Sequence, residues 1–528
     1  MSILDPINAE KLGSEKEGPF VKMASHLSSS SLRFSSTNNL TIRILLSKRK
    51  ALVSYGVLFL VISPLVNLLP LAAGQTPPPT SVVGRLPEDD RPAAISDPNL
   101  KLETVATGLN HPTAMAFLGS STDILVTEKD TGTVRRIIDG RVQEEPVLEV
   151  PVANDNRTNE RGLLGIAVAK PYVFLYYTES GDGQTGSDAN GVVPAGNRLY
   201  RYELVEEANG NSGTDQSTTT SMKLVNPKLL LDLPARPGPR YEGGKLLVRQ
   251  EQNNNTNSPT TALYLQVGHL DKSLSKETQA TNNKRGPPPD GTGGILRLDI
   301  EGNPLPNPPL VSSSNNNNNN NNGDIGMLRY YFAYGIRNGF GMDFDPVTGK
   351  LWDTENGPNN GDEINLVEPG FNSGYPKIPG GLASAEYNQP VNIDRDLVNF
   401  GGLGKYSDPK FAWDITVGVT ALKFLNSTKL GQQYENNVFI GDINNGRIYR
   451  FELNEDRTDL KLDGALADRV ANDANELRNV LFGTGFRSIS DIEVGPDGYL
   501  YILEHGRGEI ARIVPDASAA EQEGSASG

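Results

Sequence analysis

A strand–turn–strand pattern that recurs six times constrains the fold of this chain more than any other feature. Each copy has three short apolar or alternating segments, separated by turns rich in Asp, Gly and Asn. One such unit cannot bury its apolar face alone, and units repeated in this way are typical of propeller blades. The copies cover residues 114–137, 164–202, 245–298, 341–366, 417–451 and 489–513. The sequence therefore predicts an all-β fold, a six-bladed β-propeller.

The segment ahead of the first copy, residues 102–105, is a further short strand. We expect it to pair with the last blade and close the ring, because closure removes sheet edges that promote aggregation. With this strand the propeller domain is predicted to span residues 99–515. The 55 Gly and 36 Pro residues agree with many turns and disfavour a helical bundle.

Several classes of function are disfavoured by composition. The formal charge is −15 at pH 7, and the first 74 residues hold more basic than acidic side chains, so the rest of the chain is more acidic still. This acidity argues against binding nucleic acid. The absence of Cys excludes disulfides, thiolate metal sites and a Cys nucleophile. The sequence also lacks a Gly-rich phosphate loop, a serine nucleophile elbow and the H-E-x-x-H zinc motif.

Residues 51–73 form an apolar segment of about 23 residues, long enough to cross a hydrocarbon core of about 30 Å. Three basic residues, Lys48, Arg49 and Lys50, precede it and predict that its N-terminal side stays cytoplasmic. We therefore predict a signal segment or transmembrane anchor and an extracytoplasmic domain, membrane-anchored or secreted. Composition around it predicts a disordered tail over 1–50, a Pro-rich linker over 74–98 and a flexible tail over 516–528.

Three consecutive motifs occupy the fourth copy of the repeat. They read AYGIRNGFG at residues 333–341, ENGPNNGDEIN at 355–365 and PGFNSGYP at 369–376. In order and spacing they resemble the glucose/sorbosone dehydrogenase family, whose members read GHRNPQG, E-x-GP-xx-DEIN and GxNYGWP. The resemblance covers about residues 100–515. It implies a six-bladed propeller that uses pyrroloquinoline quinone (PQQ) and Ca²⁺ to oxidise aldose sugars to lactones, with electrons passing to an external acceptor.

The same resemblance implies roles for individual residues. Arg337 and Asn338 would hold the quinone, and Arg337 would be a catalytic residue as well. An Arg suits a planar anion because it stays charged and can stack. Glu160, in a segment similar to the family's second-blade motif, would face the cofactor. The remaining residues would bind calcium, which prefers oxygen ligands: the carbonyls of Gly357 and Pro358 beside the cofactor, and Asp362, Glu363 and the carbonyl of Ser373 at a structural site.

Tyr241 occupies the position of the family's catalytic base, which is a His in the segment H-x-G-G. The corresponding segment here is Tyr241 to Gly244. Oxidation of a hydroxyl needs a group that takes its proton. An unperturbed Tyr has a pKa near 10, so only about 0.1% is phenolate at pH 7, and lowering the pKa to 7 would require about 4 kcal/mol. Neighbours in an extended segment point to opposite faces, so Glu242 should face away from the channel if Tyr241 faces it.

The family's cofactor-binding cations are also replaced. The family's Lys and two Arg, which hold the cofactor's carboxylates, align with Asn444, Ser488 and Ser490. Loss of the three cations should weaken cofactor binding by several kcal/mol, at about 1.5–3 kcal/mol per charged hydrogen bond. Two of the four His residues, His269 and His505, follow predicted strands. Both lie at strand ends that could line one face, and with Asp271 or Glu504 they are candidates for a metal or acid–base set.

Three functions remain open at this point. The favoured one is quinone-dependent sugar oxidation by an extracytoplasmic propeller, with Tyr241 at the base position. The alternative is a non-catalytic, calcium-stabilised propeller that binds a glycan or protein. A calcium-dependent lactonase is the third, although the sequence does not place the several inward carboxylates it needs. Cations that converge on the channel around Arg337 would favour the enzyme.

Overall fold

The computed structural model describes residues 92–518, except 121, 155–159, 188–191, 208–220, 236–239, 254–257, 271, 273–275, 313–324 and 382–390. The chain divides into two compact units, Met1–Pro77 and Pro78–Gly528, and every described residue belongs to the second. The predicted tail, the apolar segment 51–73 and most of the predicted linker lie outside the described residues. Among the residues that are described, no helix is both long and apolar enough to cross a membrane.

Six sheets, built mainly of antiparallel strands, make up nearly all of the regular structure. The first sheet contains β3 (Pro112–Phe117), β4 (Ile124–Glu128), β5 (Thr133–Ile138), β6 (Arg141–Val142) and β7 (Leu148–Glu149). The second contains β9 (Leu163–Ala169), β10 (Tyr172–Ser180), β12 (Pro194–Glu207) and β13 (Ser221–Leu233). The third contains β14 (Leu246–Asn253), β15 (Ser258–Val267), β16 (Gly294–Asp299), β17 (Tyr331–Tyr334), β21 (Phe371–Asn372) and β22 (Lys405–Tyr406).

Three further sheets follow along the chain. The fourth contains β18 (Gly341–Phe344), β19 (Leu351–Glu355), β20 (Asp362–Val367), β23 (Phe411–Trp413) and β27 (Val470–Ala471). The fifth contains β24 (Val419–Phe424), β25 (Val438–Asp442), β26 (Ile448–Phe451), β28 (Leu481–Thr484) and β1 (Ala94–Ile95). The sixth contains β29 (Ile489–Val494), β30 (Leu500–Glu504), β31 (Glu509–Pro515) and β2 (Leu100–Thr107).

The remaining elements are small. Two short parallel strands, β8 (Ala153–Asn154) and β11 (Gly186–Ser187), pair with each other. One short helix, α2, covers Ile393–Asp396. The described 3-10 turns are η2 (Gln279–Thr281), η3 (Met327–Tyr330), η4 (Phe400–Gly402), η5 (Gln432–Tyr434), η6 (Gly464–Asp468) and η7 (Glu476–Asn479).

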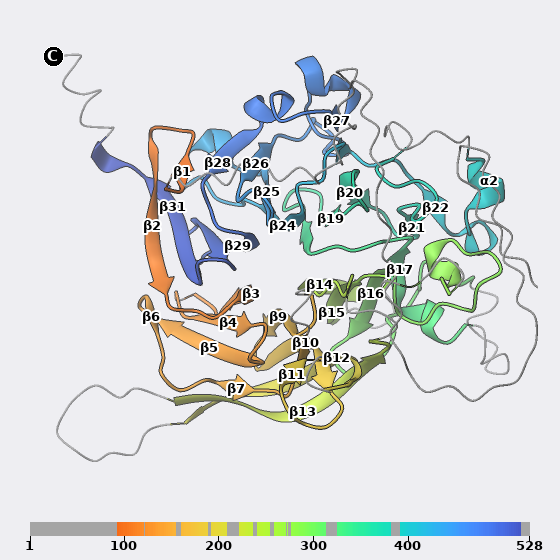
Figure 1. Cartoon of the computed structure of the whole chain (residues 1–528), viewed down its shortest axis with the longest axis horizontal. Helices are drawn as coiled ribbons and strands as arrows, with labels where there is room; N and C mark the ends of the chain where they lie inside the picture. The colour runs from red at the N-terminus through yellow and green to blue at the C-terminus, as the bar shows by residue number, and fades with distance from the viewer. Residues whose placement is uncertain are drawn as a thin grey trace, which may run out of the picture. The chain divides into compact units, whose positions relative to one another are not determined.

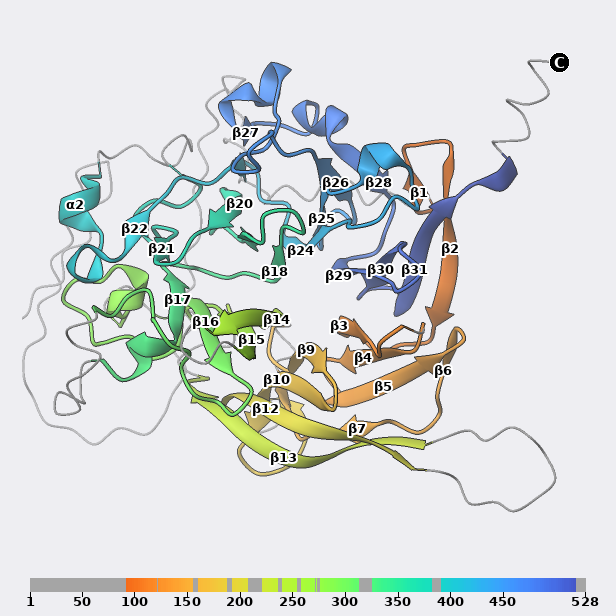
Figure 2. The ribbon, with the colours of Figure 1, turned by 180° about the vertical axis from the view of Figure 1, so that it is seen from behind.

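The first strands of the six sheets form a closed circuit. They contact one another in the order β3, β9, β14, β18, β24 and β29, and β29 contacts β3 again. Figures 1 and 2 show the sheets arranged around this common centre. The prediction of an all-β propeller is therefore confirmed.

The ring is closed by the N-terminal strand, as predicted for residues 102–105. β2 pairs antiparallel with β31, and Leu102 lies opposite Ile513. Figure 1 shows the two strands side by side, one from each end of the described chain. β1, which falls within the predicted linker, adds an edge strand to the fifth sheet beside β28.

Local sequence explains the individual elements. The middle strands of the sheets are rich in aliphatic residues and buried on both faces, as in β4 and β30. Each fully buried Leu, Ile or Val contributes about 1.5–3 kcal/mol. Turns carry the residues that their backbone requires: Asp139 and Gly140, between β5 and β6, both have positive φ, 48° and 76°. The result is a rigid frame that holds the loops at the centre.

Candidate functional site

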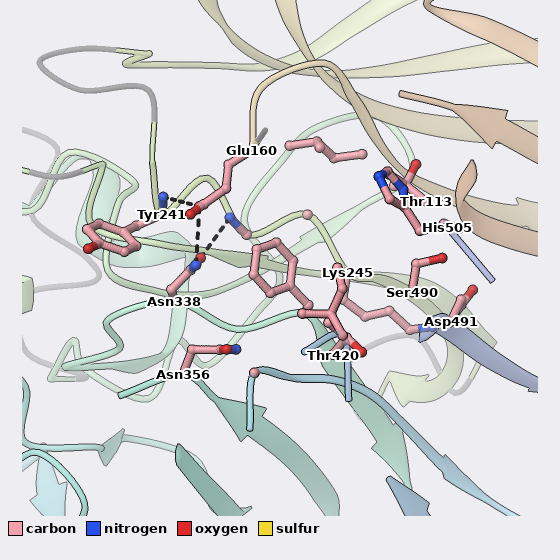
Figure 3. A pocket seen from close by; sticks show the side chains of 18 of the residues that line it. Thr113, Glu160, Tyr241, Lys245, Asn338, Asn356, Thr420, Ser490, Asp491 and His505 are labelled. Carbon is pink, nitrogen blue, oxygen red and sulfur yellow. Dashed lines mark hydrogen bonds and ion pairs between the residues drawn. The ribbon is translucent and has the colours of Figure 1, made fainter. Parts of the chain in front are cut away.

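A cavity of about 490 Å³ lies where the innermost strands of the six sheets begin. Each sheet contributes to its lining, and Figure 3 shows several of these side chains. One polar residue from each sheet, in chain order, is Thr113, Glu160, Lys245, Asn338, Thr420 and Ser490. Because a different inner strand or the loop before it supplies each residue, the composition of the cavity depends on the closed ring.

Tyr241 lies at one end of this cavity and is packed between two other side chains. The guanidinium carbon of Arg337 is 4.1 Å from the centre of its ring, a cation–π contact. On the other side, the ring of His269 is nearly parallel at 4.7 Å between centres, with 15° between the planes. The backbone of Tyr241 has φ of 62°, in the left-handed region that non-glycine residues seldom adopt. The aromatic faces of Tyr241 are therefore occupied by Arg337 and His269.

The two glycines after Glu242 allow this arrangement. Gly243 has φ of 68°, and a Cβ at this position would lie 2.5 Å from the carbonyl oxygen of Gln266. Its N–H donates to Oδ1 of Asn338 at 3.2 Å. Only a glycine fits such a close backbone approach. Glu242 itself is fully buried and pairs with Arg161 rather than lining the cavity. It does face away as expected, but not for the expected reason, because the left-handed backbone at Tyr241 is not an extended segment.

His269 does not line the cavity. Its Nδ1 lies 2.9 Å from Oε1 of Glu277, and its Nε2 lies 3.3 Å from the Tyr375 hydroxyl. The predicted partner Asp271 lies outside the described residues, and the observed partner, Glu277, was not singled out from the sequence. His269 thus supports Tyr241 from behind rather than facing the centre of the ring.

Arg337 and Asn338 join three loops at the cavity. The Arg337 backbone N–H donates to Oε1 of Glu355 at 2.6 Å, and its Nη1 donates to the carbonyl oxygens of Asn356 at 2.8 Å and Gly357 at 2.7 Å. Asn338 donates to Glu160 at 3.3 Å, and the Tyr241 N–H also donates to that carboxylate. Figure 3 shows the contacts around Glu160. Burial raises the pKa of Glu160, and these donors oppose the rise.

The residues expected to bind calcium are only partly brought together. Pro358 is exposed, and the Gly357 carbonyl accepts the hydrogen bond from Arg337. Asp362 is fully buried, and its carboxylate accepts from the backbone N–H groups of Gly357, Val417 and Gly418 at 2.7–2.9 Å. Within the part of the chain that the structure describes, no group of three or more His, Cys, Asp or Glu is arranged to hold a metal ion.

Glu363 and Ser373, in contrast, do meet, and a second carboxylate joins them. The Ser373 hydroxyl donates to Glu355 at 2.5 Å and approaches Glu363 at 3.4 Å. Glu355 lies directly opposite Glu363 across β19 and β20, and Asp353 lies opposite Asn365. All four of these side chains are buried on one face, and Oδ1 of Asp353 and of Asn365 have no hydrogen-bond partner.

The electrostatics of this carboxylate face follow from its burial. Burial raises the pKa of Glu355 to about 7. The pKa of Glu363 and that of Asp353 rise well above their usual range through burial and repulsion by Glu355. Sequence reasoning found Glu363 but missed the other two, although acidic residues two apart on one strand, opposite polar residues on the next, were a usable signal.

Sequence reasoning did not single out two buried lysines that line the cavity, Lys129 and Lys245. Lys245 Nζ lies 2.7 Å from Asp491 and 3.0 Å from Glu493. Lys129 pairs with Asp130. Together with Arg337 they place three cations around the cavity, and carboxylates lie close to each.

His505 lies at the end of the cavity opposite Tyr241 (Figure 3). Its Nδ1 is 3.1 Å from the carbonyl oxygen of Pro112, and its ring stacks on His111 at 5.0 Å. The other candidate partner, Glu504, points elsewhere: it accepts from the backbone N–H of Arg487 and pairs with Arg507 at 3.0 Å. His505 and Glu504 therefore do not form an acid–base pair.

Comparison with known families decides what this propeller is related to. The family model described as glucose/sorbosone dehydrogenase matches residues 109–512. The chain belongs to the glucose/sorbosone dehydrogenase family. The match spans all six innermost strands and so the whole lining of the cavity.

Two curated proteins are similar to this chain in sequence. The aldose sugar dehydrogenase YliI of Escherichia coli strain K12 is 25% identical over 425 residues, which cover 79% of this chain and 93% of the relative. Quinoprotein glucose dehydrogenase B of Acinetobacter calcoaceticus is 26% identical over 325 residues, 57% of this chain and 59% of the relative. The crystal structure of the soluble E. coli aldose sugar dehydrogenase in its apo form superposes with a TM-score of 0.52 at 23% identity, over 79% of this chain and all of that chain, and supports the fold.

In this member of the family, the positions expected for the family's three cations do reach the cavity. Asn444, Ser488 and Ser490 all line it. They present an amide and two hydroxyls where the resemblance implies a Lys and two Arg. The positive charge of the cavity therefore comes from other sheets than the fifth and sixth, through Lys129, Lys245 and Arg337.

Proposed function

We propose that this protein oxidises aldose sugars to lactones with PQQ as the oxidant and passes the electrons to an external acceptor. In this proposal each of the six sheets is one blade. The observation that carries it is the meeting of Glu160, Tyr241, Arg337 and Asn338 at one axial cavity in a member of the glucose/sorbosone dehydrogenase family. The names of the two curated relatives, a sugar dehydrogenase and a quinoprotein, support the same reaction class.

The residues present fit such a cofactor in size and shape. A cavity of about 490 Å³ is within the range of small-molecule sites, roughly 300–1,000 Å³. The guanidinium of Arg337 and the ring of Phe340 in the lining suit a planar aromatic acid. Lys129 and Lys245 provide further positive charge, although carboxylate partners offset it. We therefore expect PQQ to bind, with an affinity lowered by the missing cations.

Within this proposal, the chain's own residues bind the cofactor and orient the groups around it. Arg337 would hold the anionic cofactor, Asn338 would fix it by hydrogen bonding, and Glu160 would fix Asn338 and Tyr241. When bound, PQQ supplies the oxidant that takes two electrons from the sugar. A group of the protein must take the proton of the sugar hydroxyl, and Tyr241 occupies the position that the family assigns to this role.

We also propose two calcium positions. The first, at the carbonyls of Gly357 and Pro358, requires Arg337 to release its hydrogen bond to Gly357. The second lies at Glu363 and the carbonyl of Ser373, where the unpartnered oxygens of Asp353 and Asn365 fit a hard cation. Asp362 would act there indirectly, because backbone amides occupy its carboxylate. Ca²⁺ alone should raise the melting temperature, and chelation should reverse the rise.

A second candidate function is a non-catalytic propeller that binds a glycan or protein. The specific observation in its favour is that Arg337 and His269 both stack on the ring of Tyr241, at the position where a base is expected.

We further propose that the propeller is extracytoplasmic, membrane-anchored or secreted. The support is the apolar segment 51–73 with its basic flank, and glycosylation or protease accessibility in intact cells would test it.

One titration separates the two functions. The purified protein is titrated with PQQ in excess Ca²⁺, and heat and dye reduction are followed with a panel of aldoses. Binding with dye reduction supports the dehydrogenase. An absence of PQQ binding at micromolar concentrations, while Ca²⁺ still raises the melting temperature, would leave the binding propeller.

A further inference from the structure

The proton acceptor of this cavity is best sought at the end away from Tyr241. His505 follows β30 and lines the cavity there (Figure 3). Its Nδ1 lies 3.1 Å from the Pro112 carbonyl oxygen, which can only accept a hydrogen bond. Nδ1 therefore carries the proton, and Nε2 of the neutral ring has a free lone pair. Among the described residues, Nε2 has no hydrogen-bond partner.

The surroundings keep the His505 ring neutral and fixed. Burial lowers its pKa, and the neighbouring His111 and Lys129 act in the same direction, while the Pro112 carbonyl and Asp130 oppose them. His111 stacks on His505 with 19° between the planes, and its Nδ1 is bonded to Asp130 at 2.6 Å. A neutral imidazole with one bonded nitrogen and one free nitrogen is the form that acts as a general base.

The rival groups in the cavity are already engaged. The ring of Tyr241 is stacked by Arg337 and His269. Glu160 accepts from the Tyr241 N–H and from Asn338. Asp491 accepts from Lys245 at 2.7 Å and from the Met115 N–H at 3.0 Å. Among the described residues, His505 supplies the imidazole that lines the cavity.

We propose that His505 is the proton acceptor in sugar oxidation, in place of the base expected at Tyr241. The inference rests on the proposed function. In this step the O–H bond of the sugar's anomeric hydroxyl breaks and its proton goes to Nε2 of His505. The anomeric C–H bond breaks as well, and its hydrogen and electron pair go to the quinone as hydride. The sugar loses two electrons and becomes the lactone, and the quinone is reduced.

The first test is His505→Asn in the full-length protein loaded with PQQ and Ca²⁺. Asparagine keeps an N–H donor near Nδ1 for the Pro112 carbonyl but has no group at Nε2. We expect kcat for aldose oxidation to fall by about 100-fold or more, with KM little changed, since general bases contribute about 10²–10⁴. In the wild type, kcat/KM should fall as the pH drops below the lowered pKa of His505, and the variant should lose this acid limb.

Tyr241→Phe is the matched comparison, because it keeps the stacked ring and removes only the hydroxyl. The proposal requires the loss in His505→Asn to exceed the loss in Tyr241→Phe. The reverse order would overturn it and return the role to Tyr241. An active wild type with an undiminished His505→Asn variant would remove only the assignment of His505, whereas a wild type that oxidises no aldose would remove the proposed function as well.

A second readout is independent of turnover. Nitrogen NMR of the ¹⁵N-histidine-labelled protein distinguishes the two imidazole tautomers, and the chain has only four His residues. The His505 signals are those lost in His505→Asn. We expect a protonated Nδ1 and an unprotonated Nε2 near neutral pH. The opposite tautomer, or a cationic ring at neutral pH, would contradict the proposal.

Discussion

At the scale of single residues, Arg337 has the most demanding position. Its guanidinium stacks on Tyr241 and donates to two carbonyl oxygens, while its backbone N–H reaches Glu355. A planar, delocalised cation can make these contacts together. A lysine ammonium keeps the charge but has no plane to stack and no fork of donors. Charge alone is therefore not what this position requires.

Arg337→Lys tests this statement. We expect PQQ to bind about 10- to 100-fold more weakly, because one charged hydrogen bond contributes about 1.5–3 kcal/mol and 1.4 kcal/mol is tenfold in affinity. Titration calorimetry measures the change. Arg395→Lys, at an exposed pair with Asp396, is the control and should bind as the wild type does. Equal affinity in Arg337→Lys and the wild type would show that the guanidinium is not at the cofactor.

At the scale of elements, the pair β19 and β20 carries an unusual buried face. Asp353 and Glu355 on one strand lie opposite Asn365 and Glu363 on the other. The folded protein holds protons on these carboxyls at a pH where the unfolded chain has released them, since their pKa values are raised. In this case the free energy of unfolding falls as the pH rises from about 4.5, the ordinary value, to the raised value, about 7 for Glu355.

Glu355→Gln should flatten this dependence. In chelator, the wild type is expected to melt at a lower temperature at pH 8 than at pH 5.5, and the variant should melt a few °C above the wild type at pH 8. Thermal unfolding followed by circular dichroism across this pH range measures both. Glu452→Gln, at an exposed surface pair, should leave the curve unchanged. A wild type that becomes more stable from pH 5.5 to 8 would contradict the argument.

The sequence was informative about this site where its residues belong to motifs that resemble those of the family. Arg337, Asn338 and Glu160 belong to such motifs, and they do meet at the cavity, although Glu160 and Asn338 are 178 residues apart. Lys245 and Asp491 are 246 residues apart, and His505 meets a carbonyl 393 residues away. No motif spacing encodes such pairs, because they follow from the closure of the ring. The fold was predictable for the opposite reason: each repeat shows its own strands and turns.

At the scale of the whole molecule, a buried charge network crosses the centre of the ring. Lys245 precedes β14, Asp343 lies in β18, Lys423 in β24, and Asp491 and Glu493 in β29. Lys423 lies 2.8 Å from Glu493 and 3.3 Å from Asp343. Burial alone would raise the pKa of Glu493, but the two lysines outweigh it and lower that pKa to about 2. Four sheets therefore depend on one another's charges.

Lys245→Met should destabilise the whole ring, because it leaves the buried carboxylate of Asp491 without its cation, whereas Glu493 keeps Lys423. Removing one member of a buried pair costs about 3–5 kcal/mol. Lys228→Met, at an exposed pair with Glu301, is the matched control and should cost about 0–1 kcal/mol. Urea unfolding gives both values. A loss in Lys245→Met as small as that in the control would show that the network contributes little to holding the sheets together.

The pairing of β2 with β31 also has a consequence for biosynthesis. A ribosome makes residues 100–107 long before residues 509–515, so the sixth sheet cannot be completed until residue 515 has been translated. β1 waits in the same way for β28. Until then both early strands keep unpaired edges, which are templates for pairing with other chains. Premature termination anywhere before about residue 480 would leave these edges open permanently, and quality control would meet an incomplete ring rather than a shorter propeller.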